Sequence, residues 1–99
     1  MIYTKADLIS AKDRLKLEVI NTPILRSEYL NDLIQSELFF KCENFQKGGA
    51  FKFRGATNAV KRLLDSTSVS CVATHSSGNH GRALAMAAKK NGLRCIVVV

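Results

Sequence analysis

The feature that most constrains the fold is the alternation of apolar runs with helix-forming segments in the second half of the chain. Residues 69–73 and 94–99 are apolar enough for buried strands, and the alanine-rich segment 80–90 between them predicts a helix. Asn91-Gly92 is a typical helix C-cap. A further helix is predicted over residues 51–64. Strands that alternate with helices of this length indicate an α/β fold with at least some parallel strand pairing.

The first half of the chain predicts shorter elements. Thr4 and Asp7 resemble a capping box at the start of an amphipathic helix of about four turns. Pro23 ends that region and favours an extended connector, after which Ser27 caps a short second helix. The aromatic run 37–43 predicts a strand. The apolar face of the first helix would consist of Leu8, Ile9, Leu15, Val19 and Ile20, and that of helix 51–64 of Ala56, Ala59, Val60, Leu63 and Leu64.

Composition and cysteine use indicate the class of protein. With 46% hydrophobic and 23% charged residues, the 99-residue chain has ordinary globular composition, and no apolar stretch approaches the length of a membrane span. The cysteines, Cys42, Cys71 and Cys95, lie in apolar runs and are expected to be buried thiols. We therefore expect a cytoplasmic protein without membrane association. The chain stops inside a predicted strand, so we expect a fragment of a longer protein.

Charge is distributed unevenly along the chain. The net charge is +7, with −1 in residues 1–45 and +8 in residues 46–99, so an anion is expected to bind the second half. A nucleic-acid-binding or other anion-binding module without catalytic activity is one alternative. The basic residues of this chain are dispersed, however, and no nucleic-acid-binding motif accompanies them.

The loop THSSGNHG, residues 74–81, stands directly before the helix 80–90. Free N–H groups at a helix start, with hydroxyl and amide side chains beside them, favour a carboxylate or a phosphate. The alternative is a loop serine or asparagine that only caps the helix. His75 and His80 have no acidic or cysteine partners at ligand spacing, so no metal site is predicted.

Lys52 is the second candidate reactive group. It lies between Phe51 and Phe53 at a predicted helix start, near Lys47 and Arg54. The helix dipole, the apolar rings and the like charges all favour a neutral amine, which is a nucleophile toward carbonyl groups. The alternative is an exposed lysine without a chemical role.

Together, GGAFKFRGA and SSGNHG resemble the pyridoxal-phosphate-dependent serine/threonine dehydratase and serine racemase family, of fold type II. The first motif matches at Glu43, Gly48, Ala50, Phe51, Lys52 and Gly55. The second matches at Ser76, Ser77, Gly78, Asn79 and His80, and the connector at Thr22, Pro23 and Leu25 fits as well. The resemblance covers nearly the whole chain.

The resemblance implies specific residue roles. Lys52 would form a Schiff base with pyridoxal 5'-phosphate and move protons on one face of the substrate α-carbon, with Ser77 acting on the opposite face. Phe51 and Asn79 would contact the cofactor ring. The substrate carboxylate would be surrounded by Ser76, Ser77, Asn79 and His80. The implied reaction is racemisation or β-elimination (dehydration) of serine or threonine.

The resemblance also implies an architecture of two domains with open twisted sheets and flanking helices, truncated in this chain. Residues 1–66 would begin the larger, cofactor-lysine domain and residues 67–99 the smaller one. The phosphate loop and the carboxylates for a divalent cation such as Mg would lie beyond residue 99, so this fragment alone is expected to be inactive. The implied whole protein is a homodimer that binds a small amino acid and no nucleic acid. An inactive paralogue is a further alternative.

Overall fold

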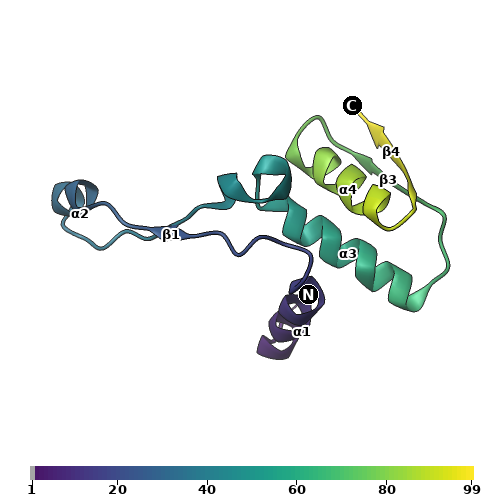
Figure 1. Ribbon diagram of the computed structural model, residues 1–99, viewed down its shortest axis with the longest axis horizontal. Coiled ribbons are helices and arrows are strands. Elements are labelled where there is room, and N and C mark those ends of the chain that lie inside the picture. Colours follow the sequence, from purple (N-terminus) through teal and green to yellow (C-terminus); the bar gives the residue numbers. More distant parts are fainter. Residues whose placement is uncertain (1) are drawn as a thin grey trace.

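A computed structural model describes residues 2–99 and shows a helical body with a projecting arm (Figure 1). The helices and strands, in chain order, are α1 Lys5–Leu15, β1 Ile24–Leu25, α2 Glu28–Ile34, β2 Phe40–Lys41, α3 Lys52–Ser66, β3 Cys71–His75, α4 Asn79–Lys90 and β4 Arg94–Val98. Two short 3₁₀ helices, η1 Glu43–Phe45 and η2 Lys47–Gly49, precede α3. No helix within residues 2–99 combines the length and the apolar character that a membrane crossing requires.

The predicted parallel pairing is confirmed for β3 and β4. Their register runs from Cys71 opposite Arg94 to His75 opposite Val98, and α4 connects them and packs against both. Gly81 on α4 comes so close to β4 that an added Cβ would lie 2.9 Å from Val97 Cγ1. The absence of a side chain at this position therefore lets α4 rest directly on the sheet.

The arm consists of α2 and the antiparallel pair β1–β2 (Figure 1). The predicted cap of α2 is confirmed, since Ser27 Oγ accepts from the Leu30 N–H. The predicted strand 37–43 is reduced to two residues, Phe40–Lys41, which pair with the two residues of β1. Large apolar side chains remain exposed along the arm: Ile24, Leu25, Tyr29, Leu33, Ile34, Phe39 and Phe40.

The helix α1 differs from its prediction. The Thr4–Asp7 capping box is confirmed, with Thr4 N–H donating to Asp7 Oδ2 at 2.8 Å. The helix nevertheless ends at Leu15, after three turns instead of four, because the following residues turn toward α3 and α4. Leu15 is its only buried residue among those described, and Leu8 is 67% exposed, so the predicted apolar face is largely uncovered.

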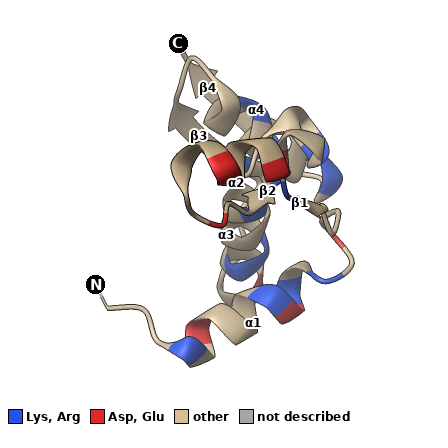
Figure 2. Cartoon of the chain, turned by 90° about the vertical axis from the view of Figure 1, so that its left-hand side faces the viewer, with Lys and Arg blue, Asp and Glu red and all other residues tan. Residues whose placement is uncertain are grey.

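The charge asymmetry predicted from the sequence maps onto separate elements (Figure 2). Both signs of charge occur on α1, whereas α4 carries Arg82, Lys89 and Lys90 and no acidic residue. The basic second half of the chain is therefore presented mainly by α3, α4 and their connections.

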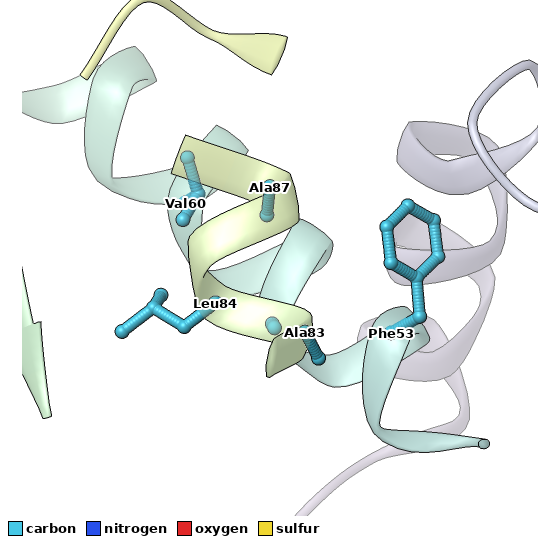
Figure 3. Close-up of a cluster of buried hydrophobic side chains, with 6 residues drawn as sticks. Phe53, Val60, Ala83, Leu84 and Ala87 are labelled. Atoms are coloured by element: carbon cyan, nitrogen blue, oxygen red, sulfur yellow. The ribbon is translucent and has the colours of Figure 1, made fainter. Parts of the chain in front are cut away.

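The core lies between α3 and α4. Phe53, Ala56 and Val60 of α3 form one buried cluster with Ala83, Leu84 and Ala87 of α4 (Figure 3). The alanines on α4 allow the two helices to approach closely, and the buried positions of α3 follow the three- and four-residue spacing of one helix face.

The prediction for the α3 face was partly wrong. Ala59 is exposed because it lies off the stripe that faces α4, whereas Phe53 and Thr57 are buried on that stripe and were not predicted. Cys42 is buried as expected, while Cys71 and Cys95 are only half-buried, and all three thiols are free.

Candidate active site

The loop before α3 places the candidate lysine at the first residue of that helix. Gly48 and Gly49, the last two residues of η2, have φ angles of +77° and +76°, a left-handed conformation that favours glycine, and they turn the chain toward α3. Lys52 is exposed, and its Nζ lies 5.3 Å from the centroid of the Phe51 ring. Its side chain forms no hydrogen bond or ion pair with any other residue in the range 2–99.

The surroundings of Lys52 differ from those predicted. Phe53 is 3% exposed and packs in the core, so only Phe51, which is 61% exposed, flanks the lysine. Arg54 is paired with a carboxylate, which compensates its charge locally. Lys47 Nζ donates to the main-chain oxygen of Glu18 at 2.5 Å and faces the Phe53 ring. Two of the expected influences on Lys52, a second ring and an uncompensated Arg54, are therefore absent.

Glu43 is the carboxylate that pairs with Arg54. Arg54 Nε and Nη2 donate to its two oxygens at 2.8 and 2.7 Å, and Thr22 Oγ1 donates to Oε1 at 2.5 Å. The Arg54 guanidinium, and then the Thr22 hydroxyl, hold the pKa of Glu43 down at about 2 against the opposing effect of burial. The carboxylate in turn raises the pKa of Arg54. These residues form a fixed charge pair next to the candidate lysine.

The loop after β3 contains the remaining candidate residues. Ser76 Oγ accepts from the N–H groups of Gly78 at 3.2 Å and Gly81 at 3.0 Å, so its hydroxyl pairs one N–H of the first turn of α4. The N-cap residue itself is Gly78, which forms no side-chain cap bond. Ser77, Asn79 and His80 are exposed, and within the described part of the chain their side chains accept and donate no hydrogen bond. The main-chain N–H groups of Asn79 and His80 also have no acceptor there. The start of α4 therefore offers unpaired donors suited to an anion.

The packing of α3 against α4 brings the two loops to one end of the helix pair. The helices lie side by side and run in the same general direction (Figure 1). Phe53, next to Lys52, shares its cluster with Ala83 in the second turn of α4. At Gly48, an added Cβ would lie 3.2 Å from Met86 Sδ of α4. The strands that precede the two loops, β2 and β3, belong to separate sheets, so the helices and not a common sheet edge align the loops.

Within residues 2–99, no three or more His, Cys, Asp or Glu side chains are grouped closely enough to hold a metal ion. Two clefts, of about 410 and 560 Å³, lie beside α1 and do not include Lys52 or Ser77.

Sequence reasoning did not predict that Thr22, Gln46 and Arg54 bond to Glu43, although all three contribute to the environment of the lysine loop. Thr22 and Gln46 are each 3% exposed. The available signal was Glu43, an acidic residue within the lysine motif that requires a partner when it is buried.

Comparison with known proteins identifies the family of the chain. Residues 15–99 match the family of pyridoxal-phosphate dependent enzymes. The chain is 53% identical over 98 residues to the β-hydroxyaspartate dehydratase of Paracoccus denitrificans, covering 99% of this chain and 31% of that protein. It is 53% identical over 97 residues to a serine racemase of Arabidopsis thaliana, covering 95% of this chain and 29% of that protein.

The structure is also similar to that of a pyridoxal 5'-phosphate-dependent aspartate racemase, with a TM-score of 0.89 and 39% identity over 98% of this chain and 32% of that one. The predicted α/β fold of fold type II is thereby confirmed. The chain spans about 30% of the length of these proteins. It belongs to the family of pyridoxal-phosphate dependent enzymes.

Proposed function

We propose that the whole protein containing this chain racemises or dehydrates serine or threonine, with Lys52 as the residue that binds pyridoxal phosphate covalently. One observation carries the proposal: the unpaired amine of Lys52 and the unpaired donors at the start of α4 lie at the same end of the α3–α4 pair. The relatives named above are a racemase of serine and a dehydratase of a β-hydroxy amino acid, which supports this substrate class.

The residues fit the cofactor. A primary amine on a rigid helix start can bond to its aldehyde carbon, the exposed Phe51 ring can flank its ring, and the Asn79 amide can donate to a ring oxygen. When bound, pyridoxal phosphate supplies an electron sink for the charge that develops at the substrate α-carbon.

The chain's own groups would then control the substrate. The N–H groups at the start of α4, with the Ser77 hydroxyl and the Asn79 amide, would bind the amino acid's carboxylate beside the positive end of the helix dipole. His80 would add a donor to this group. Ser76 would contribute indirectly, because its oxygen already accepts two N–H groups and holds the loop in shape.

Proton transfer would use two residues on opposite sides of the α-carbon. Lys52 Nζ would take the α-proton on one face, and Ser77 Oγ would deliver or remove a proton on the other. Delivery from the opposite face inverts the configuration, whereas loss of the β-hydroxyl gives dehydration.

The test is borohydride reduction of the full-length protein incubated with pyridoxal phosphate, followed by peptide mapping. We expect the cofactor adduct on Lys52 and none in a Lys52→Ala variant, while Lys47→Ala keeps it. An adduct on another lysine, or no adduct, overturns the proposal. Product analysis with L-serine, L-threonine and 3-hydroxyaspartate then distinguishes racemisation from dehydration and ranks the substrates.

A non-catalytic anion-binding module is the second candidate, favoured by the +8 charge of residues 46–99. It would show steeply salt-dependent binding to a nucleic acid and no cofactor adduct. We also propose that the whole protein is a cytoplasmic homodimer. The mass of the purified protein in light scattering tests whether it is a dimer.

A further inference from the structure

The loop that carries Lys52 is tied at both of its ends to one short segment, residues 20–22. At one end, the Gln46 amide bonds both main-chain groups of Ile20, accepting from its N–H at 3.0 Å and donating to its oxygen at 2.9 Å. At the other end, Arg54 Nη2 donates to the same Ile20 oxygen at 3.2 Å. The residues between these ties include the two glycines with positive φ and Lys52.

Glu43 joins the two ties. Its oxygens accept from Arg54 in a bidentate arrangement and from Thr22, and Gln46 Nε2 lies 3.5 Å from Oε2. The Glu43 side chain is 15% exposed and the Arg54 side chain 32% exposed, so water screens this pair less than a fully exposed one. Bidentate pairs also fix orientation, because two parallel bonds hold the planar guanidinium in one position.

The arrangement separates a fixed backbone from a free side chain. Arg54 is two residues after Lys52 in the first turn of α3, and anchoring it anchors the turn from which Lys52 projects. None of these bonds uses the Lys52 amine, which stays available.

We propose that Glu43 and Arg54 are a positioning pair that orients the Lys52 amine toward pyridoxal phosphate. The inference rests on the proposed function of Lys52. The pair acts through the backbone of α3 and touches neither cofactor nor substrate.

The experiment measures how fast pyridoxal phosphate attaches to Lys52 in the full-length protein after removal of its cofactor. Samples are quenched with borohydride at successive times, and the Lys52 peptide is quantified by mass spectrometry. Glu43→Gln keeps the shape of the side chain and removes its charge. Arg54→Lys keeps the charge and removes the bidentate geometry. Glu43→Asp is the conservative variant that should restore part of the function. The matched control is Glu37→Gln, which breaks the Arg26–Glu37 pair on the arm.

We expect attachment to slow by about tenfold or more in Glu43→Gln and Arg54→Lys, to recover partly in Glu43→Asp, and to stay within about twofold of wild type in Glu37→Gln. Rates are compared at a temperature where circular dichroism shows every variant folded. Amide hydrogen exchange of residues 45–53 should be faster in Glu43→Gln than in the control.

Two outcomes overturn the inference and are distinguishable. If the wild type labels at Lys52 and Glu43→Gln labels equally fast with lower stability, the pair is merely structural and the proposed function stands. If the wild type does not label at Lys52, the proposed function fails and the positioning role fails with it.

Discussion

The ammonium group of Lys90, the last residue of α4, donates a hydrogen bond to Oε2 of Glu18, which lies 72 residues earlier in the chain. Lys61 of α3 donates to the other oxygen of Glu18 at 2.6 Å. Because Glu18 pairs with both lysines, one carboxylate ties the segment after α1 to both core helices. The Glu18 side chain is 13% exposed.

The first prediction concerns this tie. Lys90→Met should lower the free energy of unfolding by about 0.5–1 kcal/mol, a modest value because the Lys90 side chain is 49% exposed. Lys89→Met is the matched control, because it removes the same charge from the neighbouring residue, which forms no ion pair within residues 2–99. This control should lower the free energy of unfolding by less than about 0.3 kcal/mol. Urea unfolding checks both. Equal effects of the two variants would show that Glu18 gains nothing specific from Lys90.

The second prediction concerns pH. Hydrogen bonds from Lys61 and Lys90 lower the pKa of Glu18 from 4.5 to about 2, and those from Arg54 and Thr22 do the same for Glu43. A carboxylate whose pKa is lower in the folded state stabilises the fold fully above its unfolded pKa. That contribution is lost as the pH falls from about 4.5 toward about 2.

The urea midpoint should therefore fall between about pH 6 and about pH 3 in the wild type and fall less in Glu18→Gln and in Glu43→Gln, at constant ionic strength. Glu37→Gln is the matched control, since it removes the same charge from an ion pair whose carboxylate is 70% exposed. If Glu18→Gln and Glu43→Gln retained the full wild-type pH dependence, neither carboxylate would be stabilised in its charged form by folding.

The third prediction concerns Thr57, which is 1% exposed and whose hydroxyl has no hydrogen-bond partner in the described residues. A buried unpaired hydroxyl is destabilising, and valine has nearly the same shape. Thr57→Val should raise the free energy of unfolding by about 1 kcal/mol. Thr57→Ser, which keeps the hydroxyl and removes the methyl group, should lower it. A loss of stability in Thr57→Val, measured by thermal unfolding, would mean that the hydroxyl does have a partner.

The elements of the second half could be predicted because local signals and long-range packing agree there. The Asn91-Gly92 C-cap, the alanine-rich helix and the two apolar strands all appear near their predicted positions. The strands are not buried as predicted, however, because α4 covers only one of their faces and no residue of β3 or β4 is fully buried. The length of α1 could not be predicted, since the end of the helix depends on Glu18 reaching Lys61 and Lys90, two partners far along the chain. The buried face of α3 was partly missed for the same reason: which residues are buried depends on where α4 lies.

The candidate site shows the same division. Lys52, Ser77 and Asn79 lie in recognisable motifs, so they could be singled out as candidate site residues from the sequence. The network beneath them could not, because Thr22, Glu43 and Arg54 are distant in sequence and only the folded chain places them in contact. The hydrogen bonds from Gly78 and Gly81 to Ser76 are also invisible in sequence, where a serine that holds a loop in shape and a serine that binds a ligand are identical.

The last prediction concerns Gly81, where α4 rests on the sheet. A Cβ at this residue would lie 2.9 Å from Val97 Cγ1 and 3.3 Å from both Cβ and the main-chain oxygen of Ser76. Gly81→Ala should therefore lower the free energy of unfolding by about 1–3 kcal/mol through overpacking. It should also displace Ser76, whose hydroxyl accepts from the Gly81 N–H, and so disturb the loop that carries Ser77 and Asn79.

The double variant Gly81→Ala/Val97→Ala tests this cause. Val97→Ala removes the methyl groups that the new Cβ would meet at the shortest distance, so the double variant should be more stable than the sum of the two single effects predicts, by about 1 kcal/mol. Part of the loss should remain, because the contact with the Ser76 main chain is unchanged. Gly55→Ala is the control, since an added Cβ there meets no heavy atom within 4 Å beyond the adjoining backbone of α3 and should stabilise that helix. Strict additivity of the two single effects in urea unfolding would show that Gly81 does not contact β4 as described.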